Sequence, residues 1–362
     1  MEETRYCSLC HTELSDNEDY EIDGELLCES CMEEHTTTCD HCGELIWSND
    51  SVSDEHMTLC SCCFDDHYRR CEGCGRILTD DEAVWYNDYP YCEHCYDRLE
   101  VDIEEYSYKP DPIFYGEGNR FFGVELEIDC GGKDDENAGR IKSEANVRCE
   151  HIYCKSDGSL DDGFEIVTHP MTLDYHLHNM YWADVLHEAV RLGYKSHMTS
   201  TCGLHVHINR DALGEDRDEQ EKVIERILFF VELHWNEIFI FSRRSQHNMN
   251  RWAARYGMEK TGKEILDKAK KGNTGRYAAL NLCPYMTIEF RLFRGTLKLN
   301  TLYATLQFVN RIIDTALSMS EDEIAEQSWS DFVAAITEPE LIQYLKERRI
   351  YINEEVKTEE EV

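Results

Sequence analysis

Beyond residue 120, apolar and polar residues alternate strictly in four short segments. In segment 121–129, valine, leucine and isoleucine alternate with the acidic residues Glu125, Glu127 and Asp129. Successive side chains of a β-strand point to opposite faces, so this alternation predicts a strand with one apolar and one polar face. The other three segments with the same pattern are 163–169, 204–208 and 287–293.

The polar faces of these predicted strands carry an unusual set of side chains, namely Glu125, Glu127, Glu165, His205, His207, Glu289 and Arg291. A polar face turned to water is the ordinary state of an antiparallel strand, and each segment alone fits that interpretation. Together they favour a metal site, because carboxylates two residues apart on one strand face repel each other unless a cation lies between them. Ligands rich in carboxylate favour Mg²⁺ or Mn²⁺.

Apolar residues at three- and four-residue spacing predict helices at 172–193, 217–242 and 302–319. We expect their Trp and Phe residues to lie in the core and not to bind a cofactor. Segment 246–275 is rich in Lys, Arg, Asn and Gly. Two interpretations of it stay open, a mobile lid over the active site and a solvated insertion.

The first hundred residues contain six Cys-x-x-Cys pairs that repeat with a period of 32. Each unit reads C-x2-C-x17-C-x2-C, a spacing that suits tetrahedral Zn²⁺. Modules this small use a metal in place of a large apolar core. We therefore predict three structural zinc modules, at about 5–36, 37–68 and 69–100. Their ligands would be Cys7, Cys10, Cys28 and Cys31, then Cys39, Cys42, Cys60 and Cys63, and finally Cys71, Cys74, Cys92 and Cys95.

Other pairings of these cysteines are possible. Pairing across the gaps between units leaves Cys7, Cys10, Cys92 and Cys95 without partners, whereas pairing within each unit uses every pair. A disulfide framework needs an oxidising compartment, and the start MEETRYCSLC does not resemble a secretory signal. No stretch of apolar residues approaches the length of a membrane-spanning helix, so we expect a cytoplasmic protein that does not bind a membrane. Cys62 has no predicted role.

The charge argues against nucleic acid as a partner. The chain has a net charge of -38, and residues 1–110 hold 30 Asp and Glu against 6 Lys and Arg, a net of -24. Proteins bind a phosphate backbone chiefly through Lys and Arg, so we expect a protein partner for the zinc modules. The prolines and glycines of 101–118 predict a linker. A catalytic domain at 119–350 and an acidic tail at 351–362 would follow it.

Two family resemblances accompany these patterns. The cysteine spacing of residues 5–98 resembles the zinc-binding halves of LIM domains and related treble-clef modules. Beyond the linker, five motifs in order resemble the glutamine-synthetase-like carboxylate–amine ligases, above all the amidoligase branch found in bacteria and their phages. The motifs span about 120–318 and read GVELEID, DGSL with GFEIVTHP, TCGLHVHIN, RYAALNL and TIEFRLFRGTL.

The second resemblance implies an α+β fold, in which a curved antiparallel sheet with packed helices binds ATP and two or three divalent ions over its polar face. It implies that Glu125 and Glu127 hold separate metal ions. Three further metal ligands are implied at Glu165, His205 and Glu289.

The same resemblance implies roles for the basic residues. His207 would lie near the nucleotide, and Arg291 would clamp the transferring phosphoryl group. Arg276 would contact phosphate or substrate, with Asn281 as a further match. We expect Arg291, Arg276 and Glu165 to take part in catalysis.

The function implied is an ATP- and divalent-metal-dependent ligase that joins a carboxylate to an amine through an acyl phosphate. The zinc modules would recruit a partner, in a bacterial cell or a phage-infected host. One alternative is a non-catalytic adaptor whose ligase-like sheet only supports the zinc modules. Another is a metal hydrolase that uses His205 and His207. The pattern does not identify the acid or the amine.

Overall fold

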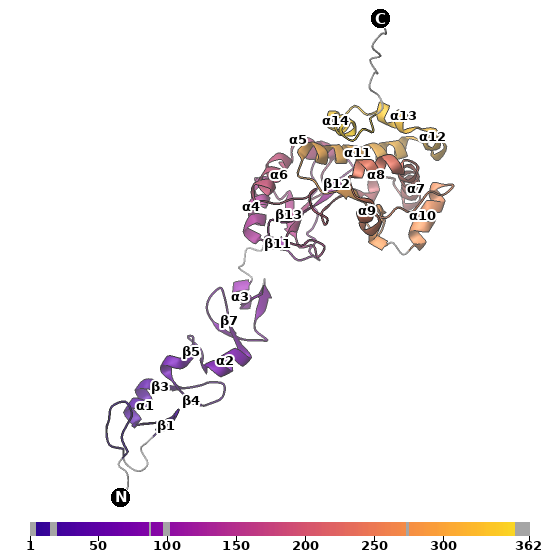
Figure 1. The fold of residues 1–362 in the computed structure, drawn as a ribbon. Helices are drawn as coiled ribbons and strands as arrows, with labels where there is room; N and C mark the ends of the chain where they lie inside the picture. Colours follow the sequence, from indigo (N-terminus) through magenta and orange to yellow (C-terminus); the bar gives the residue numbers. More distant parts are fainter. Residues whose placement is uncertain (1–4, 15–19, 87, 97–101, 273–274, 352–362) are drawn as a thin grey trace. The chain divides into compact units, whose positions relative to one another are not determined.

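The chain divides into two compact units, Met1–Glu100 and Val101–Val362, in a computed structural model (Figure 1). The structure describes residues 5–14, 20–86, 88–96, 102–272 and 275–351. Most of the predicted acidic tail, from residue 352 on, therefore lies outside the described residues.

The first unit repeats one small motif three times, a two-stranded hairpin followed by a short helix. A two-stranded hairpin precedes the second Cys pair of each module, and a short helix carries the last cysteine of that pair. The hairpins are β1 (Tyr20–Ile22) with β2 (Glu25–Leu27), β5 (Ser51–Ser53) with β6 (Thr58–Cys60), and β9 (Val84–Tyr86) with β10 (Tyr89–Tyr91). The helices are α1 (Glu29–His35), α2 (Ser61–His67) and α3 (Glu93–Tyr96).

Two further hairpins begin the second and third modules, and they join the modules through shared apolar cores. These hairpins are β3 (Thr36–Thr38) with β4 (Leu45–Trp47), and β7 (Tyr68–Arg70) with β8 (Ile77–Thr79). Leu45 and Trp47 pack against the core of the first module, beside Ile22. Ile77 packs into the core of the second module, beside Leu59. Each of the first two modules is thus completed by the hairpin that begins the next one.

The second unit is built on a seven-stranded sheet with the strand order β11-β13-β14-β12-β15-β17-β16. Its neighbouring strands are antiparallel except for β11 and β13, which are parallel. The strands are β11 (Ile103–Glu104), β12 (Phe122–Ile128), β13 (Ile152–Lys155), β14 (Phe164–Thr168), β15 (Gly203–Asn209), β16 (Leu280–Asn281) and β17 (Thr287–Arg294). The four strands predicted from alternation are β12, β14, β15 and β17.

Helices cover the apolar face of this sheet, and α11 lies between the sheet and the last helices of the chain (Figure 1). The first helices are α4 (Asp135–Ala145), α5 (Leu173–His178), α6 (Trp182–Arg191), α7 (Arg217–Leu233) and α8 (Trp235–Ser242). The later ones are α9 (Gln246–Trp252), α10 (Gly262–Lys271), α11 (Leu299–Ser318), α12 (Glu321–Glu326), α13 (Trp329–Ala334) and α14 (Pro339–Glu347). The unit is therefore a mixed α+β fold with one large core.

The strand alternation explains why the sheet has two unlike faces. Val124, Leu126 and Ile128 of β12 are fully buried, as are Val206 and Phe290 of the neighbouring strands β15 and β17. These side chains belong to the same core cluster as the apolar residues of α11. The acidic and histidine side chains of the same strands consequently share the opposite face.

Two predicted helices are each broken in two. Segment 172–193 forms α5 and α6, because the chain leaves the helical path between them and buries Trp182, whose indole donates to His176 at 3.2 Å. Segment 217–242 forms α7 and α8, with the break at His234. Neither break contains Pro or Gly, the residues that mark breaks in a sequence.

The described part of the segment predicted as a linker, 101–118, packs on the second unit. Ile103 is buried, and β11 extends the sheet by pairing with β13. Tyr115 forms a bridge with Met171 and packs against the core. Two prolines and two glycines here shape an ordered stretch of the second unit.

Segment 246–275 is not a solvated insertion in its described part. It contains α9 and α10, which bury Met249, Ile265 and Leu266 in the main core. No helix of the described residues is both long and apolar enough to cross a membrane.

The junction of β12 with the chain entering β14 allows a test of this packing. A Cβ atom at Gly163 would lie 2.0 Å from the carbonyl oxygen of Ile128, so Gly163→Ala must displace backbone. We expect the substitution to lower the free energy of unfolding by about 1–3 kcal/mol, measured by urea denaturation. Gly158→Ala is the matched control, because a Cβ there meets nothing within 4 Å. Equal stability of both variants would contradict the strand packing described.

Candidate active site and metal centres

The twelve paired cysteines of the first unit form three separate clusters. Within each cluster the four sulfur atoms all lie within 4.8 Å of one another. The clusters are Cys7, Cys10, Cys28 and Cys31, then Cys39, Cys42, Cys60 and Cys63, and then Cys71, Cys74, Cys92 and Cys95. The prediction that each unit pairs within itself is confirmed.

The spacing of the sulfur atoms fits zinc. A tetrahedron with Zn–S bonds of about 2.3 Å has sulfur–sulfur edges of about 3.8 Å. The sulfurs of Cys10 and Cys28 are 3.6 Å apart, and those of Cys74 and Cys92 are 3.9 Å apart. Four thiols at these distances are the donor set of a structural zinc site.

The surroundings of the thiols favour thiolate at one position of each cluster. Burial acts to raise the pKa of Cys7, but the backbone N–H groups around its sulfur outweigh burial and lower the pKa to about 6. Cys39 and Cys71 occupy the same position, and their pKa is lowered to about 6 for the same reason. In the first cluster, burial and the neighbouring thiols raise the pKa of Cys31 to about 12. Four thiolates can therefore coexist only around a cation.

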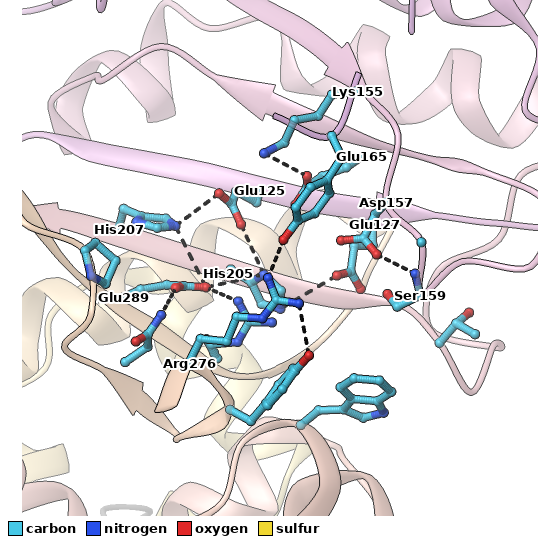
Figure 2. Close-up of a pocket in the computed structure, with 18 of the residues that line it drawn as sticks. Glu125, Glu127, Lys155, Asp157, Ser159, Glu165, His205, His207, Arg276 and Glu289 are labelled. Carbon is cyan, nitrogen blue, oxygen red and sulfur yellow. Dashed lines mark hydrogen bonds and ion pairs between the residues drawn. The ribbon is translucent and has the colours of Figure 1, made fainter. Parts of the chain in front are cut away.

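The polar face of the large sheet forms the floor of a cavity of about 900 Å³ (Figure 2). Every residue of the second unit predicted to bind metal, nucleotide or substrate lies along it. These residues are Glu125, Glu127, Glu165, His205, His207, Arg276, Asn281, Glu289 and Arg291. They come from β12, β14, β15, β16, β17 and the short helix Gly275–Tyr277, at positions up to 166 residues apart in the sequence, between Glu125 and Arg291.

Two groups of three side chains on this floor have the geometry of cation sites. Glu125, Glu165 and His205 form one group, and Glu125, His207 and Glu289 form the other. In each group the ligand atoms lie within 4.8 Å of one another, and Glu125 belongs to both. Carboxylate oxygens with one imidazole nitrogen suit Mg²⁺ or Mn²⁺.

Strand register explains this meeting of side chains. Glu125 lies opposite His205, and His207 lies opposite Glu289. Between the pairs Leu204–Phe293 and Val206–Phe290, β17 has one residue more than β15. The bulge leaves Arg291 and Leu292 together opposite His205, and bulges of this kind are frequent beside active sites.

The electrostatics of the floor depend on neighbouring charges. Burial acts to raise the pKa of Glu125, but His207 and His205 outweigh burial and hold the pKa well below its usual range. Burial and the charge of Glu125 raise the pKa of Glu165 well above its usual range, and Lys155 does not offset them. Two carboxylates on one floor therefore have pKa values shifted in opposite directions, as expected of like charges close together.

Glu127 lies at the edge of the floor, where the backbone of Gly203 comes very close to several side chains. Its carboxylate accepts the N–H of Gly203 and lies 3.9 Å from the Nε2 atom of His205. A Cβ atom at position 203 would lie 2.6 Å from Arg244 and 2.7 Å from His205. A side chain here would have to displace the ends of the Arg244 and His205 side chains, so glycine keeps both in their places at the edge of the floor.

Two arginines reach the cavity in different ways. Arg291 pairs with Glu289, with 2.5 Å between Nη1 and Oε1, and Asn281 donates to the other oxygen of Glu289 at 2.6 Å. Arg276 reaches over the polar face (Figure 2) and donates to the hydroxyl groups of Tyr106 and Tyr277. Arg291 is therefore set in the floor, and Arg276 spans two walls.

Several lining residues have no counterpart among the predicted ones. Lys155 is buried beside Glu165, with 3.3 Å between Nζ and Oε2. Arg244 is 7% exposed, and its Nε has no hydrogen-bond partner among the described residues. Burial lowers the pKa of Arg244 to about 10, although Glu127 acts to raise it. The only sequence signal for Arg244 is its place just after an apolar helix.

We expect the purified full-length chain to bind three zinc ions, measured by elemental analysis. Cys42→Ser should reduce the content to two ions, because one cluster loses a thiolate ligand. Cys62→Ser is the matched control, since Cys62 is exposed and belongs to none of the three clusters. Chelation should unfold the first unit and leave the second folded. One zinc or none per chain would contradict the three sites.

No family model matches this chain, and no curated protein matches it. Among solved structures, the crystal structure of a bifunctional glutathione synthetase from Pasteurella multocida is similar, with 14% identity and a TM-score of 0.36. The match covers 63% of this chain and 46% of that chain. This chain therefore spans less than half of the length of that enzyme, and a likeness of this size does not define its function.

Proposed function

We propose that the second unit is an ATP- and divalent-metal-dependent ligase that joins a carboxylate to an amine through an acyl phosphate. The observation that carries this proposal is the pair of three-residue groups that share Glu125 on the floor of one cavity. Arginines from the floor and from a wall face the same space. Phosphoryl transfer needs this combination of cations and guanidinium groups around charged oxygens.

The formal charge of the cavity lining supports a triphosphate as the ligand. Five carboxylates and five Lys or Arg side chains line the cavity, so its lining is formally neutral when the histidines are neutral. Two divalent cations would bring the lining to about +4, which balances the roughly four negative charges of ATP. The carboxylates are Glu125, Glu127, Asp157, Glu165 and Glu289, and the cationic side chains are Lys109, Lys155, Arg244, Arg276 and Arg291.

In the first step, an oxygen of the acid attacks the terminal phosphorus of ATP, and the bond from that phosphorus to the ADP oxygen breaks. Divalent cations in the two groups would shield the phosphate oxygens and polarise the transferred phosphoryl group. Arg291 pairs with Glu289 on the floor, where its guanidinium can hold the phosphoryl oxygens as they move from donor to acceptor. Arg276 is held by two tyrosines and can orient a second anionic group.

In the second step, the amine nitrogen attacks the acyl carbon, and the bond from that carbon to the phosphate oxygen breaks. Phosphate leaves with the electron pair of that bond, and the nitrogen loses a proton. Asp157 and Glu127 line one end of the cavity and give it an acidic edge that attracts a cationic amine. The product is an amide or an isopeptide.

The zinc unit is proposed to recruit a protein partner. Its strongly acidic composition supports this role, because a phosphate backbone would be repelled. A link between recruitment and ligation would give the enzyme its macromolecular substrate or its location.

Replacing both Glu125 and Glu127 by Gln tests the chemistry. The variant keeps the strand pattern and removes two negative charges from the floor. We expect metal-dependent ADP formation, assayed over a panel of acids and amines, to fall at least about 100-fold. Far-UV circular dichroism should show a folded protein. An adaptor would show no ADP formation in the wild type, and full activity in the variant would contradict the ligase proposal.

Arginine-to-lysine variants separate binding from catalysis. Arg291→Lys keeps the charge and loses the planar fork, so we expect kcat to fall about 10-fold or more while the Kd for ATP changes little. Arg244→Lys should also lower kcat, since Arg244 lines the cavity and its buried Nε has no hydrogen-bond partner among the described residues. Arg140→Lys is the control, because Arg140 pairs with Glu188 and does not line the cavity. Parallel losses in ATP affinity and kcat would contradict the role given to Arg291.

A further inference from the structure

The three modules of the zinc unit can be compared position by position. Tyr20 pairs with Leu27, Val52 with Leu59, and Val84 with Tyr91. Each pair is displaced by 32 residues on both strands, so the hairpins share one register. A residue of one hairpin therefore has a defined counterpart in the other two.

In the first two modules this hairpin is covered by the next module. Leu45 and Trp47 lie against the first core, and Ile77 lies against the second. The backbone N–H of Ile77 also donates to the carboxylate of Asp54, at the end of the covered hairpin, over 2.6 Å. Each covering strand thus packs apolar side chains against the preceding module, and in the second module it also donates a backbone hydrogen bond.

The third module has no such cover among the described residues. The members of its core cluster all come from 71–95. The position that follows Leu45 and Ile77 by the repeat is Lys109, and Lys109 lines the cavity of the second unit. The repeat therefore ends at the third module, and no described hairpin equivalent to β3 with β4 or β7 with β8 follows it.

Several side chains of this last hairpin are accordingly exposed to solvent. Tyr89 is 56% exposed, whereas its counterpart Met57 is only partly exposed and packs in the second core. Tyr91 is partly exposed, whereas Leu59 is fully buried. On the other face, Trp85 is 53% exposed opposite Pro90. The counterparts of Trp85 are the polar residues Glu21 and Ser53.

The opposite end of the array is different. Glu13 occupies the position of Leu45 and Ile77, so the first module presents a carboxylate where the others present apolar cover. Terminal repeats normally have such a polar outer face. The first module therefore presents a polar residue at this position, whereas the third module exposes aromatic residues. A head-to-tail contact between copies would set Glu13 against that aromatic end.

We propose that the terminal hairpin surface docks a short extended segment of another protein, in which apolar side chains are flanked by Lys or Arg. The surface consists of Val84, Tyr89 and Tyr91, which share the face of the hairpin that corresponds to the covered face of the second module. The apolar part of the docked segment would take the place of the strand that covers the other two hairpins. This inference concerns recruitment alone and does not depend on the ligase chemistry.

Charge selects the flanking residues of the partner. The sequence from 77 to 96 contains no Lys or Arg. Its acidic residues are Asp80, Asp81, Glu82, Asp88 and Glu93. A cationic segment is attracted to such a surface, whereas a second copy of this chain, with its net charge of -38, is repelled.

A synthetic peptide with Leu-Ile-Trp, the sequence of β4, between pairs of lysines is the probe. We expect it to bind the zinc-loaded full-length chain, and Val84→Ser with Tyr89→Ser should weaken the Kd at least about 10-fold. Isothermal titration calorimetry gives the Kd. Tyr6→Ser is the matched control, since Tyr6 is 53% exposed in the first module, and it should leave the Kd unchanged.

A peptide with Ser-Ser-Ser between the same lysines separates docking from simple charge attraction. Equal binding of both peptides, no binding, or equal binding by the double variant would overturn the proposal. Sedimentation of the chain alone would show whether a second copy covers the surface. A dimer that the double variant dissociates would also overturn it. ADP formation by the double variant should stay at the wild-type level, so this test and that of the ligase proposal are read separately.

Discussion

Repulsion among carboxylates on one face of a sheet is the constraint around which the second unit is organised. Glu125, Glu165 and Glu289 come from three strands and meet on the floor of one cavity. Histidine and lysine side chains offset part of this repulsion, as the opposite pKa shifts of Glu125 and Glu165 show. A fold that gathers charge in this way requires a large apolar core beneath the sheet. The single cluster that joins the strands to α11 meets that requirement.

The strands and the floor residues could be predicted because period-two alternation states which side chains share a face. In β12 and β17 the alternation is long enough to leave no doubt about the polar set. It does not state which strands are neighbours; that follows from the pairing of β12 with β14 and β15 and of β15 with β17. Strand β13 has only four residues, so Lys155 left no comparable signal.

Other features depend on contacts between distant parts of the chain. Tyr106 lies in a stretch whose prolines and glycines predict a linker, yet it lines the cavity and contacts Arg276. The breaks between α5 and α6 and between α7 and α8 follow from burial of side chains, and no Pro or Gly announces them. Arg244 gains its importance from an approach to Gly203 that only the folded chain reveals. Cysteine spacing, in contrast, predicted all three clusters, since four ligands at fixed separations leave little freedom.

The shared cores of the zinc modules give the array a direction. Leu45 and Trp47 complete the first module, and Ile77 completes the second, but in the described part of the array no module is completed by the one before it in this way. Loss of the metal from the third module would loosen the strand that covers the second, whereas loss from the first would leave the later cores intact. Metal release would then spread toward the amino terminus as a one-way, domino-like process. The order in which the three ions leave during a slow titration with chelator would reveal this polarity.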